Sequence, residues 1–433
     1  MIRTQDRTPW WRRRIVDAWL GRPLLALWRL LDAVSPKHLD RWAFFVHPLK
    51  PGQFVENARA VFEQVRDDAS IRKYVFLRAG QHPPGLEETA HVTVIALDTL
   101  AGLWALTRCG VWLLTNSTPM DLSFLWHGGG YAAPRPCLRR RVLVNLWHGV
   151  PLKRLFALAH PDQRRNGDRN RFRRNERRHY DGVVASSEID SHAMAAIFHP
   201  LPPDRVWDTG LPRNDFLRLP EADLPSTLAN ELRQVRALRA GRTMVLYAPT
   251  YRDASVAASL CHRFDAAQTA QLQQLLRQYG AVLGVRGHYL RNAPAPFDAD
   301  AFAGDTLLDL GHDRFHEIAP LLRESSLVVT DYSSVFIDAL YLDLPVLSFA
   351  YDLNHYRQHQ NGLLYDMDLA FPGPVTTDFA SFLAALEAQL AGRVPRGPRY
   401  AAARRMFFRH DDAHNTDRLL QRLHACIAER RAR

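Results

Sequence analysis

The chain has 433 residues, a formal net charge of +11, 47% hydrophobic residues and 23% charged residues. One ordinary hydrophobic core does not cover so long a chain, so two domains are expected, and the composition excludes a disordered protein. The four cysteines have no paired spacing, which argues against a zinc ribbon or a disulfide framework and fits a reducing compartment.

The positive charge is concentrated in two segments. Residues 1–31 carry seven arginines against two acidic residues, and residues 164–178 carry eight arginines against two. The rest of the chain is therefore close to neutral. A positive field this localised predicts a polyanionic partner, which is an anionic membrane, a nucleic acid or a phosphate-rich polymer.

Residues 1–40 form the first predicted segment. Its part from Trp10 to Val34 mixes four tryptophans with arginine and leucine, and Pro23 is expected to split it into two short helices. Tryptophan at the headgroup level and arginine near phosphates suit an interfacial helix, so we predict an amphipathic membrane-binding segment. The alternative is an amphipathic helix that packs on its own domain.

Neither a signal peptide nor a transmembrane helix is expected. The basic N-terminus lacks a clean apolar core followed by a cleavage site of small residues. The most apolar stretch, residues 92–114, contains Asp98 and Arg108, and its pattern is better explained by a strand, a helix and a strand.

After Pro36, two series of short apolar runs alternate with helical stretches, and a proline-rich linker at residues 199–204 separates the series. Such alternation predicts parallel sheets that helices cover on both faces. We therefore predict an α/β protein in which two Rossmann-like domains, residues 41–205 and 206–398, face a cleft and a helical tail follows at 399–433. The expected strands are residues 74–77, 91–97, 111–116, 142–147 and 183–186 in the first domain, and 244–248, 281–285, 306–310, 327–330 and 346–349 in the second.

Polar residues follow several of these strands, at the sheet edge where open α/β sheets bind ligands. His148 comes after the run at 142–147, with Gly149 relaxing the backbone and Lys153 placed to meet a phosphate. A histidine whose pKa lies near neutral pH can take a proton from an attacking hydroxyl. The alternative is a structural histidine in a turn.

Two further clusters lie in the second domain. Arg286 and His288 follow the strand at 281–285, where two such groups suit a diphosphate; the alternative is a surface turn. Ser333 and Ser334 lie where a helix is expected to begin, so free backbone N–H groups and hydroxyls could bind phosphate there. The alternative is a plain helix cap.

The remaining candidates carry weaker patterns. Arg252 follows the strand at 244–248 and could face the cleft or pair with Asp253, and Asp331 could cap or orient its neighbours. Asp338 lies one to two turns into the helix after Ser334. The pairs Asp298/Asp300 and Asp366/Asp368 match an Asp-x-Asp pattern too weak to assign a metal, although a divalent ion such as Mg²⁺ could assist.

Taken together, the clusters resemble the CDP-glycerol glycerophosphotransferase family, the teichoic-acid and capsule-polymer primases and polymerases. The resemblance covers about residues 50–420 and includes, in the family's order, the segments NLWHGVPLK (145–153), GLPRND (210–215), YAPTYRD (247–253), RGH (286–288), TDYSSVFID (330–338), LPVLSFAYDLNHY (344–356) and NGLLYD (361–366).

The resemblance implies a GT-B fold with the nucleotide mainly on the second domain, and a monotopic enzyme on the cytoplasmic face of the cell membrane. It implies that His148 is the general base and that His288 is a catalytic or donor-phosphate ligand. Arg286, Asp331, Ser333 and Ser334 would lie around the donor diphosphate, with the role of Asp338 left open.

The expected reaction moves a polyol phosphate, glycerol phosphate before ribitol phosphate, from a CDP-activated donor to a hydroxyl of a phosphate-rich polymer or lipid-linked acceptor, and releases CMP. An anionic membrane surface is the further expected partner, and no nucleic acid is expected. Two alternatives stay open: a GT-B glycosyltransferase that uses a nucleotide-sugar, and a non-catalytic polyanion-binding protein at the membrane surface. The basic run at 164–178 motivates the second alternative.

Overall fold

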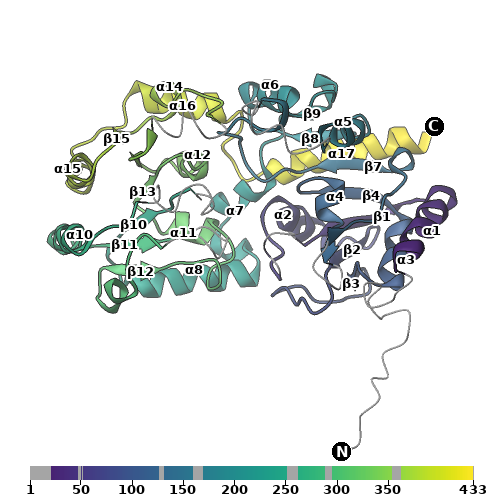
Figure 1. Cartoon of the computed structure of the whole chain (residues 1–433), viewed down its shortest axis with the longest axis horizontal. Coiled ribbons are helices and arrows are strands. Elements are labelled where there is room, and N and C mark those ends of the chain that lie inside the picture. Colours follow the sequence, from purple (N-terminus) through teal and green to yellow (C-terminus); the bar gives the residue numbers. More distant parts are fainter. Residues whose placement is uncertain are drawn as a thin grey trace, which may run out of the picture.

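The computed structural model describes residues 21–46, 50, 52–125, 131–158, 169–250, 262–287, 295–353 and 362–432. They form two parallel β-sheets that occupy separate halves of the molecule, each with helices packed around it (Figure 1). The expected α/β class with two parallel sheets is therefore confirmed.

The first sheet has seven strands in the order β3-β2-β1-β4-β7-β8-β9, and every neighbouring pair is parallel. Its strands are β1 (His38–Phe45), β2 (Arg72–Leu77), β3 (Val92–Ala96), β4 (Cys109–Leu114), β7 (Val142–Asn145), β8 (Gly182–Val184) and β9 (Val206–Trp207). The helices of this domain are α1 (Gly21–Val34), α2 (Glu56–Val65), α3 (Leu100–Arg108), α4 (Thr118–Asp121), α5 (Arg169–Arg177) and α6 (Glu188–Ile197), and a two-stranded hairpin is formed by β5 (Phe124–Leu125) and β6 (Tyr131–Ala132).

The second sheet has six parallel strands in the order β12-β11-β10-β13-β14-β15. Its strands are β10 (Thr243–Tyr247), β11 (Ala281–Val285), β12 (Leu307–Asp309), β13 (Leu327–Thr330), β14 (Val346–Phe349) and β15 (Val375–Thr376). Its helices are α7 (Asp215–Arg218), α8 (Ser226–Arg239), α10 (Ala266–Gln278), α11 (Ala319–Arg323), α12 (Val335–Tyr341), α14 (Met367–Ala370), α15 (Phe379–Leu390) and α16 (Pro398–Phe407).

Both sheets reverse their strand order next to their first strand. The direction changes between β1 and β4 in the first sheet and between β10 and β13 in the second. Loops on the two sides of such a point diverge and leave a crevice beyond the carboxyl ends of the strands. The loops after β7, β10 and β13 supply the residues of the site described below.

The last helix, α17 (Asn415–Ala432), returns from the second domain to the first (Figure 1). Its residues Leu419, Leu423 and Ile427 are buried in one hydrophobic core with Trp42 of β1. Asp215 caps its beginning, because the Asp215 carboxylate accepts hydrogen bonds from the backbone N–H groups of Asn415 and Thr416 at 2.9 and 2.8 Å. The predicted helical tail therefore belongs to both domains.

The helix α1 carries its apolar residues on two sides. Trp28 faces the protein, where its indole N–H donates to the Leu103 carbonyl at 2.9 Å. Leu27, Leu30 and Val34, on the other side, are 62%, 66% and 75% exposed. Pro23 lies in the first turn of α1, where its missing N–H costs nothing; the residues before Gly21 lie outside the described part. Within the described ranges, no helix is long and apolar enough to span a bilayer.

Candidate functional site

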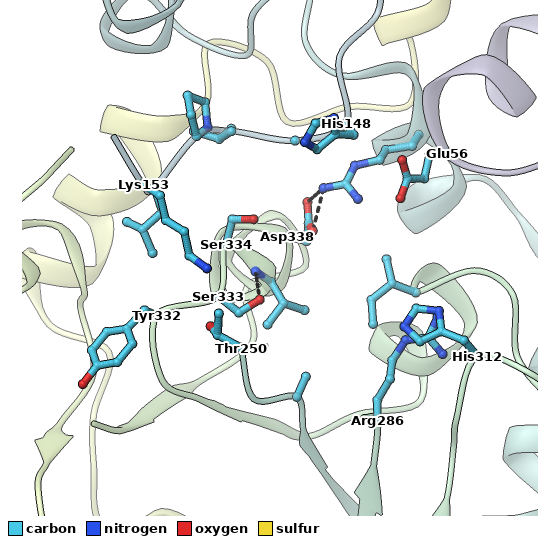
Figure 2. A pocket seen from close by; sticks show the side chains of 18 of the residues that line it. Glu56, His148, Lys153, Thr250, Arg286, His312, Tyr332, Ser333, Ser334 and Asp338 are labelled. Carbon is cyan, nitrogen blue, oxygen red and sulfur yellow. Dashed lines mark hydrogen bonds and ion pairs between the residues drawn. The ribbon is translucent and has the colours of Figure 1, made fainter. Parts of the chain in front are cut away.

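A cavity of about 350 Å³ lies between the two domains. Figure 2 shows His148 on one wall, with Thr250, Ser333 and Ser334 across the cavity and Arg286 beside His312. The first domain contributes Lys50, Glu56, Leu155 and residues 147–153, and the second contributes Arg213, residues 248–250, 286–287, 312, 316–318 and 332–335, and Asp338.

His148 is held by a backbone turn that its neighbours fix. Trp147 has a φ of +53°, a conformation that is uncommon for a bulky residue. Two buried asparagines hold the turn: Asn145 accepts a hydrogen bond from the Trp147 N–H at 2.9 Å, and Asn57 donates to the Trp147 carbonyl at 3.0 Å. Asn145, at the end of β7, thus helps to fix the position of His148.

The surroundings of the His148 ring favour its neutral form. Burial lowers its pKa, and a hydrogen bond with the Thr115 backbone and the charge of Glu56 oppose that lowering only in part. The residue keeps a solvent-exposed surface toward the cavity while protein surrounds its other sides, including the Trp147 ring at 4.1 Å between ring centroids. A neutral imidazole that faces a cavity can accept a proton.

Gly149 brings the two domains close together. Its φ is +156°, and a Cβ placed there would lie 3.1 Å from Nη2 of Arg213. That nitrogen donates to both carboxylate oxygens of Asp338 at 2.8 Å. The absence of a side chain at residue 149 thus allows the His148 loop to lie directly against a buried ion pair of the second domain.

The opposite wall is formed by the turns after β10 and β13. Ser334 is the cap of α12 and its side chain makes no capping hydrogen bond, while the Ser333 hydroxyl accepts from the Val335 N–H at 3.4 Å. Asp331 is buried and does not line the cavity. Its Oδ1 accepts from the N–H groups of Thr250 and Tyr332 at 2.8 and 2.6 Å. This carboxylate holds the two turns together, as expected of a residue that orients its neighbours, and its place near a donor diphosphate stays a prediction.

Arg286 is buried at the end of β11 and is tied to the loop that follows β12. It donates to the carbonyls of Leu310 and Phe315 at 3.1 and 2.9 Å and contacts Nδ1 of His312 at 3.0 Å. Burial lowers its pKa to about 10, so the guanidinium remains charged at neutral pH. Arg286 lines the cavity as predicted, and its contact with a donor diphosphate stays a prediction.

Lys153 reaches into the cavity from the first domain, toward Ser333 and Ser334 (Figure 2). Its backbone position is set by a bridge to the second domain, where Lys153 pairs with Leu363 and Arg154 N–H donates to the Gly362 carbonyl at 3.0 Å. The segments around residues 153 and 363 are thus spatial neighbours. Arg252 and His288 lie outside the described residues.

One carboxylate of each Asp-x-Asp pair has a partner within the protein. Asp366 caps α14 by accepting from the Asp368 N–H at 2.8 Å, and Asp298 pairs with Arg263. Within the described ranges, no group of three or more His, Cys, Asp and Glu side chains could hold a metal ion.

A family model described as CDP-Glycerol:Poly(glycerophosphate) glycerophosphotransferase matches residues 40–425, which is most of the chain. The chain belongs to this family. The resemblance expected from the motifs, and the assignment as an enzyme of this family, are therefore confirmed.

Curated relatives agree with this assignment. The chain is 26% identical over 328 residues to a teichoic acid poly(glycerol phosphate) polymerase of Bacillus subtilis, covering 75% of this chain and 40% of that protein. It is 23% identical over 398 residues to a teichoic acid ribitol-phosphate primase of Bacillus spizizenii, covering 90% and 92%. The chain thus spans well under half the length of the first relative and nearly all of the second.

Solved structures agree on the fold. The wall teichoic acid polymerase TagF superposes with a TM-score of 0.75 at 19% identity, covering 95% of both chains. A UDP-N-acetylglucosamine 2-epimerase from Listeria monocytogenes superposes with a TM-score of 0.53 at 11% identity. This glycerophosphotransferase family member therefore has the GT-B-like arrangement of two parallel sheets.

Sequence reasoning missed several residues of this site. Arg213 was seen only as part of the segment at 210–215, yet it pairs with Asp338. Lys50 lies in the loop after β1 and Glu56 is the first residue of α2, and their side chains form an ion pair at 2.5 Å. A polar loop gives no local signal that it faces a cavity, so these residues could be found only once the sheet order was known.

Proposed function

We propose that this enzyme transfers a polyol phosphate, glycerol phosphate before ribitol phosphate, from a CDP-activated donor to an acceptor hydroxyl and releases CMP. The product would be a teichoic-acid-like or capsular polymer of the cell surface. The observation that carries the proposal is the position of His148, a neutral imidazole of the first domain that faces Ser333 and Ser334 across one cavity (Figure 2).

In the proposed reaction the neutral His148 ring takes the proton of the acceptor hydroxyl. The hydroxyl oxygen bonds to the polyol-bearing phosphorus as that phosphorus loses its bond to the CMP oxygen, and the electron pair leaves with CMP. Lys153, Arg286 and the hydroxyls of Ser333 and Ser334 would hold the diphosphate while negative charge moves to the leaving group. His288 and Arg252, which lie outside the described residues, stay predicted contacts of the donor.

We also propose that the enzyme works on an anionic membrane surface, which suits a lipid-linked acceptor. The support is the stripe on α1 formed by Leu27, Leu30, Leu31 and Val34, positions that share one helix face and point away from the protein. Exposed Arg29, Arg139 and Arg140 lie on or next to this helix, and Arg140 donates to the Ala33 carbonyl at 2.9 Å. Apolar side chains flanked by arginine fit a bilayer interface with anionic headgroups.

The deciding experiment measures CMP release from CDP-glycerol and CDP-ribitol, and UDP release from a UDP-sugar, with a membrane-derived acceptor extract. CMP release that falls on the order of 100- to 10,000-fold in His148→Ala supports the proposal, because a general base contributes a factor of that size. His192→Ala, which removes an exposed histidine on α6, is the matched control and should turn over like the wild type.

Turnover of the UDP-sugar alone would assign the chain to the nucleotide-sugar transferases instead. Wild-type rates in His148→Ala would contradict the role of this histidine, whichever donor is used.

A further inference from the structure

A second cavity, of about 300 Å³, adjoins the first. The two share Lys50, Glu56, Trp147, His148 and Leu155, so His148 lies on the boundary between them. The second cavity extends only into the first domain. Its own walls come from the loop after β4 with α4, from Phe156, from α5 and the turn that follows it, and from the end of α6, and they include Ser117, Arg173, Glu176, Arg177 and Tyr180.

The backbone around this cavity is strained. Glu56, Trp147 and Phe156 have φ values of +63°, +53° and +53°, and they are three of the five non-glycine residues with positive φ in the described part of the chain. All three line the second cavity. Residues in such conformations persist where the surrounding structure enforces them, and they gather at ligand sites.

Glu176 is a buried acidic group on this wall, with 2% of its surface exposed. Its Oε1 accepts three hydrogen bonds, from the N–H and hydroxyl of Thr118 at 2.6 and 2.5 Å and from the Tyr180 hydroxyl at 2.7 Å. Within the described residues, every hydrogen bond to this carboxyl ends on Oε1. The other oxygen is therefore available to a hydroxyl in the cavity.

Two arginines of the basic run also line this cavity. The guanidinium carbons of Arg173 and Arg177 lie 4.7 and 4.3 Å from the centroid of the Phe156 ring, and Arg177 is fixed by a hydrogen bond to the Ile197 carbonyl at 2.9 Å. Aromatic faces, two guanidinium groups and a carboxylate together suit a ligand with carbon, phosphate and hydroxyl groups.

The geometry of in-line displacement determines from which side the acceptor hydroxyl approaches the phosphorus. The attacking and leaving oxygens lie on opposite sides of the phosphorus. If the diphosphate and CMP lie against Ser333 and Ser334 in the second domain, the hydroxyl approaches from the first domain, where His148 separates the two cavities.

We propose that the second cavity binds the terminal polyol phosphate unit of the acceptor, an inference that rests on the proposed transferase function. The terminal hydroxyl reaches His148, which takes its proton as the new oxygen–phosphorus bond forms and the bond to CMP breaks. A second hydroxyl of the unit donates to Glu176, and the phosphate that links it to the rest of the acceptor lies near Arg173.

The test fills the cavity without changing the donor side. Ser117 lines only the second cavity, and Ser117→Phe places a ring in it. Ser226→Phe adds the same ring at an exposed position at the start of α8 and serves as the control. With oligo(glycerol phosphate) as the acceptor, the KM for the oligomer should rise at least about tenfold in Ser117→Phe while the KM for CDP-glycerol stays unchanged.

A second, isosteric variant decides the matter if Ser117→Phe fails to fold by circular dichroism. Glu176→Gln keeps the acceptor for the Thr118 and Tyr180 hydrogen bonds but replaces the second oxygen with an N–H₂ group. The KM for the oligomer should again rise about tenfold, the effect of losing one hydrogen bond in a buried site, with donor KM unchanged.

The outcomes separate the two proposals. CMP release by the wild type, with an unchanged KM for the oligomer in both variants, overturns the acceptor site and leaves the proposed function standing. If the wild type releases no CMP from any CDP-polyol, the proposed function fails, and calorimetry with oligo(glycerol phosphate) alone tests the cavity. Binding that is lost in the variants supports the site; equal binding in the wild type and variants, or none, overturns it.

Discussion

The proposed role of His148 as a general base depends on the surroundings of its ring. Because burial lowers its pKa below the ordinary value of 6.5, the ring is already neutral at pH 7 and stays so at higher pH. We expect kcat/KM for the donor to rise with pH along an acid limb whose midpoint lies below 6.5, and then to level off. A pH profile of CMP release measures this. A midpoint above 6.5 would contradict the expectation, because it would mean that a nearby charge stabilises the imidazolium.

Gly149 lets the loop that carries His148 lie against Arg213. In Gly149→Ala, both the positive φ and the contact of the new Cβ with Nη2 of Arg213 are unfavourable. The free energy of unfolding should fall by about 1–3 kcal/mol, measured by urea denaturation, and CMP release should fall with it. Gly287→Ala is the matched control in the same cavity, because a Cβ there meets nothing within 4 Å. An equal effect of the two substitutions would exclude a special role for residue 149.

At the residue scale the sequence predicted the groups that follow strands. Of the candidate side chains, His148, Lys153, Arg286, Ser333, Ser334 and Asp338, together with Gly149, line the cavity. Asp331 does not line it, because its short side chain turns back to the backbone N–H groups of Thr250 and Tyr332, as the capping alternative expected. In the sequence, Glu176 entered only the net charge of the basic run at 164–178. Its burial under Thr118 depends on a contact between segments 58 residues apart.

At the element scale, α1 has a hydrophobic stripe on its solvent side. We expect Leu27→Gln combined with Leu30→Gln to lower recovery on vesicles that contain phosphatidylglycerol by at least about tenfold, since each buried leucine contributes about 1.5–3 kcal/mol. Sedimentation with the vesicles measures this. Leu369→Gln, which removes another leucine, 77% exposed, from α14, is the control. Unchanged recovery of the α1 variant, or an equal loss in the control, would contradict membrane docking through α1.

Elements with a simple hydrophobic pattern were the ones that the sequence predicted best. Strands β11, β13 and β14 have the predicted bounds, because each is a short apolar run between polar turns. The explanation of residues 92–114 as strand, helix and strand is confirmed by β3, α3 and β4. The strand β1 was missed, although it lies inside its sheet between β2 and β4, because His38–Phe45 begins with four largely polar residues that are only half-buried. The first half of β1 is extended because of its pairing with neighbouring strands, and hydrophobicity gives no signal for it.

At the scale of the whole molecule, a buried carboxyl joins the two domains. Glu317 accepts a hydrogen bond from the Glu56 backbone N–H at 2.6 Å, and burial raises its pKa to about 7. The folded protein therefore holds this proton more tightly than the unfolded chain, whose glutamate has an ordinary pKa of 4.5. The stability that this group contributes is fully present below pH 4.5 and is lost as the pH rises through about 7.

Glu317→Gln should accordingly remove part of the pH dependence of stability. Between pH 4.5 and 7.5 the wild-type free energy of unfolding should decline relative to that of the variant by on the order of 3 kcal/mol. Denaturation curves across this range measure the difference, with Glu429→Gln, an exposed position on α17, as the control. Parallel pH curves for the wild type and Glu317→Gln would show that the carboxyl is already ionised in the folded protein.

The return of α17 to the first sheet has a consequence for the order of events during synthesis. Domains usually fold in turn as the chain leaves the ribosome, the N-terminal one first. Here Trp42 of β1 shares its core with Leu419, Leu423 and Ile427, which emerge almost 380 residues later. The sheet of the second domain, whose strands lie within residues 243–376, is complete before then. Its folding can therefore finish while part of the older sheet is still uncovered, so the nascent chain carries an open apolar surface until α17 arrives.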